Sequence, residues 1–400
     1  MRAMNQRLAL ALLVLSGCPS SSPTGGADAG ATDMTAPLQL PPWMVSASIL
    51  AHGDDSVQDC RTQICRHNEN TDLTRWNGDV WLVHRTAHSQ ILGDNSALHV
   101  YHSPDNGVTL AETAIIPAVT GRDIRDPHFY TVGKDLWIKC LTRLPVTSER
   151  DSNVDTIAMA THSSDGKTWS PLVAIGPPTW SFWRIQQHAG VYYTAAYADG
   201  DASVALFTST DGAAWTQGAT IYDVTAMTPL ETELTFFPSG TLLALVRTDG
   251  DAQQLLGDLA TRQTQVCWSQ PPYATFDCSQ SLVGERLDGP LSFFWQGRLF
   301  EVARKHLGAN DHKRTALFEL SASSGDGGAG ALDGGPLAIK EWGEFPSAGD
   351  TAYAGMVMLD DHRALVSWYS GELYLDETWV LGMLDTTDIW TAVVDLSLLK

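Results

Sequence analysis

The chain has 400 residues, of which 44% are hydrophobic and 18% charged, and its formal net charge is −21 at pH 7. This composition is typical of a globular protein and excludes a chain that is disordered throughout. The negative charge argues against nucleic acid as a partner and against a polybasic membrane surface, because both require a basic face. Fourteen tryptophans are many for this length, and such rings suit strands and sugar-binding clefts.

The first residues predict export with a lipid anchor. Arg2 and Arg7 precede an apolar run at residues 8–15 that is too short to span a bilayer. Residues 15–18 (LSGC) resemble a bacterial lipobox, which would make residues 1–17 a lipoprotein signal peptide and Cys18 the lipidated first residue. An ordinary signal peptide with an incidental cysteine is the alternative.

The residue after Cys18 is proline rather than the aspartate that usually retains lipoproteins at the inner membrane. We therefore expect the protein at the outer membrane, on its periplasmic or its surface face. Residues 18–42 are rich in Ser, Gly, Ala and Pro, so they predict a lipid-anchored disordered tether. The folded part is expected to cover residues 43–400.

The remaining five cysteines would lie in an oxidising compartment. Cys60 and Cys65 are close in sequence, as are Cys267 and Cys278, so we expect two disulfides and a free Cys140. No Cys/His cluster has zinc spacing, and the sequence predicts neither a metal nor a cofactor.

A short turn recurs along the chain. Residues 163–169 (SSDGKTW) are repeated at 209–215 (STDGAAW), and 103–109 (SPDNGVT) is a third copy without the tryptophan. The aspartate can bond its own backbone, and glycine supplies the positive φ that the turn needs.

A second repeat sets the fold. A turn residue is followed seven positions later by the end of a strand at Arg85, Cys140, Tyr197, Arg247, Arg304 and Tyr369. The intervals of 50–65 residues match one four-stranded propeller blade each. We predict an all-β, six-bladed β-propeller, closed by pairing of a last strand near residues 388–399 with the N-terminal chain.

Three of these positions are arginine. Equivalent strand ends of a propeller converge at one rim, so Arg85, Arg247 and Arg304 should face one cavity, where their guanidinium groups suit a substrate carboxylate. The alternative is that each arginine forms a structural ion pair with a nearby acid.

The hairpin turns place residues opposite these positions. Counting about each turn sets Glu231 opposite Arg247 and Tyr353 opposite Tyr369. The same count sets Glu69 opposite Arg85 and Asp288 opposite Arg304, where an ion pair is the favoured interpretation.

Three Arg, a Glu and a Tyr in this order, with Asp-containing turns between them, resemble the exo-α-sialidase (neuraminidase) superfamily and its Asp-box (BNR) repeats. The similarity spans roughly residues 60–398. It is carried by residues 231–247, 289–304, 350–355 and 366–370, while residues 123–127, 183–185 and 269–273 and His88 resemble a bacterial branch of sialidase-like proteins.

The resemblance implies a retaining hydrolase with Tyr353 as the nucleophile, Glu231 as its base, and Arg85, Arg247 and Arg304 as the carboxylate-binding residues. The arginine cluster would also favour the phenolate form of the tyrosine. The general acid is left open between Asp94, His88 and Asp126.

Arg125 and the aromatic residues Trp183, Tyr197 and Tyr369 are candidates for substrate contacts, with core packing as the alternative for each ring. Three functions follow: an exo-glycoside hydrolase that releases terminal acidic sugars, a non-catalytic glycan-binding surface propeller, or a glycosidase or lyase for another anionic sugar. The expected partner is an anionic glycan or polysaccharide, and the expected state is a monomer.

Overall fold

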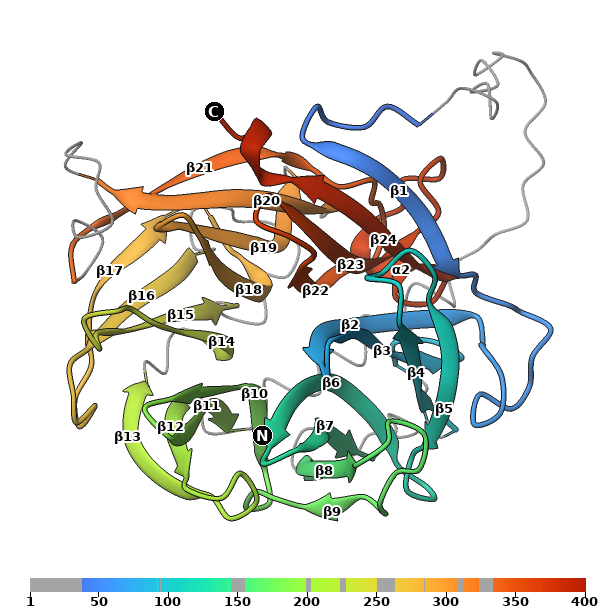
Figure 1. Cartoon of the computed structure of the whole chain (residues 1–400), viewed down its shortest axis with the longest axis horizontal. Coiled ribbons are helices and arrows are strands. Elements are labelled where there is room, and N and C mark those ends of the chain that lie inside the picture. The colour runs from blue at the N-terminus through green and yellow to red at the C-terminus, as the bar shows by residue number, and fades with distance from the viewer. Residues whose placement is uncertain are drawn as a thin grey trace, which may run out of the picture.

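The computed structural model describes residues 38–91, 93, 95–144, 155–198, 203–223, 228–249, 263–283, 285–307, 312–323 and 334–400. Within these residues, six four-stranded antiparallel sheets surround a central axis (Figure 1). The predicted six-bladed β-propeller is therefore confirmed. No helix in the described part of the chain is both long enough and apolar enough to cross a membrane.

The strands follow one another from the axis outward in each blade. Blades one and two consist of β2 (His67–Trp76), β3 (Asp79–Ala87), β4 (Ala97–Ser103) and β5 (Ala111–Pro117), then β6 (Asp123–Val132), β7 (Asp135–Arg143), β8 (Ile157–Ser163) and β9 (Val173–Ala174). Blades three and four consist of β10 (Trp180–His188), β11 (Val191–Ala198), β12 (Ser203–Ser209) and β13 (Thr216–Tyr222), then β14 (Pro229–Phe236), β15 (Leu242–Thr248), β16 (Gln263–Ser269) and β17 (Asp277–Val283).

Blade five consists of β18 (Asp288–Trp295), β19 (Arg298–Leu307), β20 (His312–Ala322) and β21 (Leu337–Glu344). Blade six combines β22 (Thr351–Met358), β23 (Arg363–Gly371) and β24 (Thr387–Asp395) with β1 (Met44–Ala51). The short helices α2 (Trp379–Gly382) and η4 (Leu396–Leu398) precede and follow β24.

The two ends of the described chain close the ring, as the sequence predicts. β1 pairs antiparallel with β24, with Ala47 opposite Ala392, and the two strands lie side by side in Figure 1. This pairing covers the edge of β24, which would otherwise expose unpaired backbone groups.

The repeated turns share a hydrogen-bond pattern. The Asp165 carboxylate accepts the backbone N–H groups of Lys167 and Thr168 at 2.8 and 2.7 Å. Gly166 has φ +71°, and a Cβ there would lie 1.9 Å from the Trp81 ring of the preceding blade. The turns at Asp211 and Asp105 also bond their own backbone. These turns thus fix the outer hairpins against neighbouring blades.

Each inner strand carries a β-bulge near its start. At each bulge two residues lie opposite one residue of the neighbouring strand, and the pairs are 70–71, 126–127, 183–184, 230–231, 289–290 and 353–354. Bulges redirect side chains and bend the strand. The six bulges therefore bring irregular backbone to the same end of the ring.

The cysteines pair as their spacing predicts. Cys60 bonds Cys65 and Cys267 bonds Cys278, and Cys140 is free and buried. The first disulfide closes a loop before β2, and the second joins the two outer strands of blade four.

Large apolar side chains fill the space between blades, and Trp368 shows what they contribute. It is fully buried between the rings of Phe345 and Trp390, and its indole N–H donates to the carbonyl of Pro346 at 2.9 Å. We expect Trp368→Ala to lower the free energy of unfolding by about 3–5 kcal/mol, because it leaves a large cavity. Denaturant unfolding measures this. Val108→Ala, at a side chain that is 82% exposed, should change it by less than about 0.5 kcal/mol.

Candidate functional site

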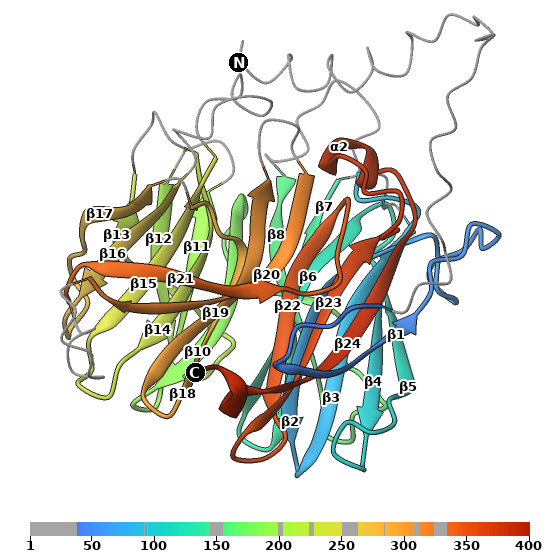
Figure 2. The same cartoon turned by 90° about the horizontal axis from the view of Figure 1, so that it is seen from above.

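A cavity of about 200 Å³ opens at the end of the ring where the bulges lie. Charged and aromatic side chains dominate its wall, among them Arg125, Asp126, Arg143, Glu231, Arg247, Arg304, Tyr353 and Trp379. Trp379 belongs to α2, which lies at one rim of the ring in Figure 2.

Tyr353 and Glu231 meet on this wall. The Tyr353 hydroxyl donates to Glu231 Oε1 at 2.5 Å, and Arg247 Nη1 donates to both Glu231 oxygens at 2.8 Å. Arg247 Nη1 also lies 3.4 Å from the Tyr353 hydroxyl. The phenol, the carboxylate and one guanidinium nitrogen therefore form a single hydrogen-bonded group from blades four and six.

The register of blade six differs from the predicted one by one residue. Tyr369 pairs with Ala352 rather than with Tyr353, because the bulge at 353–354 adds a residue to β22. The pairings of Glu69 with Arg85 and of Asp288 with Arg304 are as predicted. The bulge places Tyr353 at φ +49°, in the left-handed region that bulky residues rarely adopt.

Gly289 makes room for this tyrosine. It holds the corresponding bulge position in blade five with φ +56°, and a Cβ there would lie 3.0 Å from the Tyr353 ring. The Arg304 guanidinium lies 5.4 Å from the centre of the same ring. Glycine and arginine from blade five thus define the position of the phenol.

The three arginines of the repeated position differ in their surroundings. Arg247 and Arg304 line the cavity, whereas Arg85 is fully buried and is not among the described residues that line it. Arg85 bonds Glu69 at 2.5 Å and Asp123 at 2.8 Å, so it is a buried ion-pair partner beneath the wall.

Carboxylates also engage the two cavity arginines. Arg247 bonds Asp249 at 2.8 Å and lies 3.1 Å from Asp288, in addition to its bonds to Glu231. Arg304 bonds Asp288 at 3.2 Å and Asp350 at 3.0 Å. Of the three arginines expected to face one cavity, Arg247 and Arg304 line it, and both also engage protein carboxylates.

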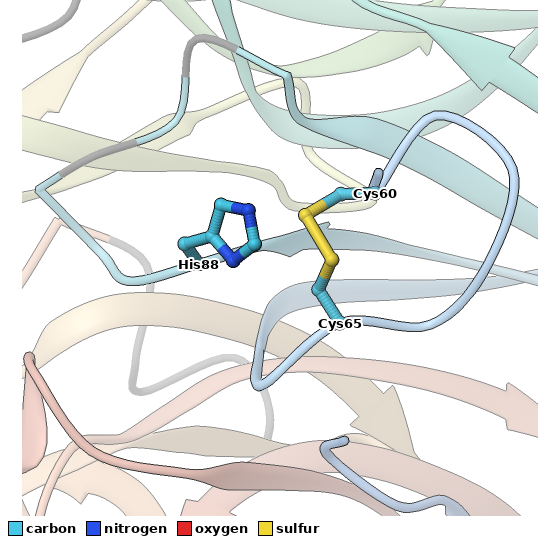
Figure 3. A group of neighbouring side chains, drawn as sticks. All are labelled: Cys60, Cys65 and His88. Atoms are coloured by element: carbon cyan, nitrogen blue, oxygen red, sulfur yellow. A yellow bond between two sulfur atoms is a disulfide. The ribbon is translucent and has the colours of Figure 1, made fainter. Parts of the chain in front are cut away.

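The three candidates for the general acid differ in where they lie relative to the cavity. Asp94 lies outside the described residues. His88 is not among the described cavity residues; its Nε2 lies 3.2 Å from the carbonyl oxygen of Gln58, and its ring faces the Cys60–Cys65 disulfide (Figure 3). Asp126 lines the cavity and holds a bulge position with φ +46°.

The three aromatic residues predicted to contact substrate also differ in their position relative to the cavity. Tyr197 lines the cavity, whereas Trp183 and Tyr369 are buried beneath Tyr353, with ring centres 5.8 and 6.2 Å from it. Trp183 donates its indole N–H to Glu233 at 3.1 Å, and Tyr369 donates to Asp350 at 3.0 Å. The rings of Trp183 and Tyr369 therefore pack against Tyr353 on the side away from the cavity.

Burial changes the acidity of the cavity groups. It raises the pKa of Tyr353 well above its usual value, and the charge of Glu231 adds to that rise while Arg247 and Arg304 oppose it. The arginines do favour the phenolate, as expected, but burial and the charge of Glu231 have the larger effect on the pKa of Tyr353. Burial also raises the pKa of Asp126 to about 6, although Lys139 and Arg125 oppose the shift.

Sequence reasoning missed several cavity residues. Arg143 follows the repeated position of blade two by three residues, at the end of β7, and Trp379 comes from a helical turn outside the blade pattern. Gln90 and Asn70 belong to a loop and a bulge. The only signal for Arg143 was a basic residue at a strand end of a very acidic chain.

Two groups of described residues have the atoms to hold a metal ion. The sulfur atoms of Cys60 and Cys65 are joined in a disulfide beside His88, so they are not thiolate ligands (Figure 3). In the second group, His67 lies 3.5 Å from both Glu69 and Asp350, whose other oxygens bond Arg85 and Arg304.

The second group gives a stability prediction. Burial lowers the pKa of His67, but Asp350 and Glu69 outweigh it and raise the pKa to about 9. Because the pKa of His67 is higher in the folded state, protonation of His67 stabilises the fold. This contribution to the free energy of unfolding is fully present below about pH 6.5 and is lost as the pH rises through about 9. We expect the stability difference between the wild type and His67→Gln to shrink by roughly 3 kcal/mol from pH 6 to pH 10.

Urea unfolding at a series of pH values measures this difference. Subtracting the free energy of unfolding of the variant from that of the wild type removes the contributions of other titrating groups. Lys139 is one of them, because burial lowers its pKa to about 8. A difference that stays constant over this range would contradict the charged state of His67.

No protein-family model matches this sequence, and neither does any curated protein. Among solved structures, the NanB sialidase of Streptococcus pneumoniae has a TM-score of 0.61 at 12% identity, covering 91% of this chain and 72% of that one. A protein of unknown function from Dyadobacter fermentans has a TM-score of 0.59 at 16% identity, covering 87% and 99%.

The α-L-arabinanase of Penicillium chrysogenum, in complex with arabinobiose, has a TM-score of 0.55 at 15% identity, covering 89% of this chain and 99% of that one. At these identities the similarity shows the fold alone. The chain is thus a six-bladed propeller of the kind that sialidases and an arabinanase share, with a phenol–carboxylate–arginine group in its cavity.

Proposed function

We propose that this protein is an exo-acting glycoside hydrolase that releases terminal acidic sugars from glycans through a tyrosine nucleophile. The observation that carries the proposal is the 2.5 Å hydrogen bond from the Tyr353 hydroxyl to Glu231 on the cavity wall. A phenol needs a base within hydrogen-bond reach to act as a nucleophile, and Glu231 meets that need. The fold shared with sialidases supports the same reaction class.

The first half of the reaction uses Tyr353, Glu231 and Arg247 together with Asp126. Tyr353 attacks the anomeric carbon and passes its proton to Glu231, while the bond to the leaving-group oxygen breaks. Because its pKa is raised, the phenol stays protonated until this step. Arg247 holds the Glu231 carboxylate in place. Asp126 gives its proton to the leaving-group oxygen.

The second half reverses these roles. The Asp126 carboxylate takes a proton from water, the resulting hydroxide attacks the anomeric carbon, and the bond to Tyr353 breaks. The phenolate then recovers its proton from Glu231. The configuration at the sugar is retained, because two displacements take place.

Asp126 interacts electrostatically with Tyr353 and Glu231. Its negative charge raises the pKa of Tyr353, and the charge of Glu231 in turn raises that of Asp126. A carboxyl group with a pKa of about 6 keeps a usable protonated fraction near neutral pH. This property favours Asp126 over His88 as the general acid.

The nucleophile can be tested by Tyr353→Phe. We expect kcat on an aryl sialoside or aryl uronide to fall on the order of 10³-fold or more, because the attacking oxygen is removed. Tyr374→Phe is the matched control, since Tyr374 is 57% exposed, and it should leave kcat unchanged. Turnover of neither substrate by the wild type would instead favour glycan binding without catalysis.

The acid can be tested by Asp126→Asn. For a substrate with a poor leaving group, kcat/KM should fall about 10²–10⁴-fold, and less for an aryl leaving group that departs without a proton. The wild-type rate should decline as the pH rises through about 6, because Asp126 loses its proton there. Asp361→Asn, at an exposed hairpin turn, is the control. A decline that persists unchanged in Asp126→Asn would assign the acid to another group.

We also propose that Cys18 anchors the protein to the outer membrane through a lipid, so that the cavity acts on glycans in the cell envelope. Residues 1–37 lie outside the described part of the chain, and the lipobox-like sequence supports this proposal. In a bacterial host, Cys18→Ser should move the protein from the membrane fraction to the soluble fraction after cell disruption. Equal membrane retention of both forms would contradict the anchor.

A further inference from the structure

Two buried donors on the cavity wall have no hydrogen-bond partner. They are Nη2 of Arg125 and Nε of Arg143, and both residues line the cavity. Among the described cavity side chains, the remaining buried polar atom without a partner is an acceptor, Oδ1 of Asn70. Leaving a buried N–H of a charged group without a hydrogen bond is costly, so this part of the wall suits a group that accepts hydrogen bonds.

The two arginines form one patch on blade two. Arg125 is in β6 and Arg143 is at the end of β7, and both face Asp123, the residue opposite Arg143 in the sheet. Arg125 Nε bonds Asp123 at 2.6 Å, whereas Arg143 Nε lies 3.8 Å from it. The Arg125 side chain is 9% exposed and the Arg143 side chain 19%.

Positive charge exceeds negative charge in this region when Asp126, whose carboxyl group also acts on Arg125, is protonated. Asp123 and Glu69 then face three guanidinium groups, those of Arg85, Arg125 and Arg143. Burial, together with the like charges of Arg125 and Arg85, lowers the pKa of Arg143 to about 10. A bound anion would offset this repulsion.

The other side of the cavity differs. Arg247 uses all three of its guanidinium nitrogens on Glu231, Asp249, Asp288 and the Tyr353 hydroxyl. Arg286 and Arg304 also bond Asp288, and Arg304 bonds Asp350 as well. At Arg247 a substrate anion would therefore have to displace protein carboxylates.

We propose that Arg125 and Arg143 form the subsite that binds the acidic group of the substrate. This proposal rests on the hydrolase function proposed above and names the residues that select an anionic sugar. A carboxylate has two oxygens in one plane, which match N–H donors from two guanidinium groups. Arg125, Arg143 and Tyr353 line the same cavity, and Asp126 follows Arg125 directly in the chain. In the proposed complex the acidic group lies on the side of Asp126 and the anomeric carbon faces Tyr353, which belongs to blade six, with blade one between the two (Figure 1).

Binding to the full-length Tyr353→Phe protein tests the subsite without any need for turnover. Isothermal titration would compare N-acetylneuraminic acid, glucuronic acid and uncharged glucose. We expect at least one of the acids to bind and glucose to bind about tenfold more weakly or not at all, because a charge-assisted hydrogen bond is lost. Failure of both acids to bind would overturn the subsite.

Two arginine variants in the same background identify the residues. Arg143→Gln and Arg125→Gln should each raise Kd for the acid about tenfold or more, with Kd for glucose unchanged. Arg363→Gln is the control, because Arg363 is 54% exposed and pairs with Asp360 in a distant hairpin. Thermal unfolding verifies that each variant is folded. If Arg125→Gln does not fold, the more exposed Arg143 decides the result.

An unchanged Kd for the acid in folded Arg143→Gln would overturn the proposal. Hydrolysis is measured separately with the wild type. If the acid binds through Arg143 and no glycoside is cleaved, the subsite stands and the hydrolase function fails. If the wild type is active, Arg143→Gln should raise KM for the acidic glycoside and change kcat much less, whereas a structural defect would lower both the active fraction and the unfolding temperature.

Discussion

The bulges near the starts of the inner strands β2, β6, β14 and β22 are the constraint on which the cavity depends, because each places at least one residue on its wall. In a regular strand successive side chains point to opposite faces, whereas the bulge in β14 turns two consecutive residues, Leu230 and Glu231, to the cavity. The extra residue lets Asn70, Asp126 and Tyr353 adopt positive φ. Each such conformation costs of the order of 1–3 kcal/mol and persists only where the surroundings determine it. For Tyr353 these surroundings are Gly289, Trp183, Tyr369 and the bond to Glu231.

Beneath the bulges, buried ion pairs connect the blades. Asp288 receives Arg247, Arg286, Arg304 and His306, so one carboxylate ties blade four to blade five. Removing one partner from such a network leaves an uncompensated charge, which destabilises more than the intact pairs stabilise. The network also fixes Arg247 and, through it, the Glu231 carboxylate. The relative positions of the Tyr353 hydroxyl and the Glu231 carboxylate are thus fixed by the protein itself.

The repeats predicted the fold because each is a local turn with its own chemistry. The hydrogen bonds of the Asp165 carboxylate and the positive φ of Gly166 form within the hairpin itself, so its sequence predicts the turn. The contact between Glu231 and Tyr353 was expected because both residues lie near the start of an inner strand, at matching places in two blades, and because the resemblance to sialidases pairs a Glu with a Tyr. The one-residue offset at Tyr353 could not be predicted, since a bulge adds a residue without changing the hydrophobic pattern. Whether Arg85 would be enclosed and Arg143 exposed to the cavity depends on the position of Asp123, a contact between blades that strand counting does not give.

The pairing of β1 with β24 has a consequence for how the molecule folds. Ser48 and Thr391 face each other across this pair although 343 residues separate them along the chain. Five blades consist of strands that are consecutive in the sequence and can form as each segment emerges from the ribosome. The sixth blade cannot be completed until synthesis reaches β24, because its outermost strand, β1, is synthesised first and pairs with β24. Tyr353 belongs to that blade, so its hydrogen bond to Glu231 lies in a blade that is complete only once the two ends of the described chain have met.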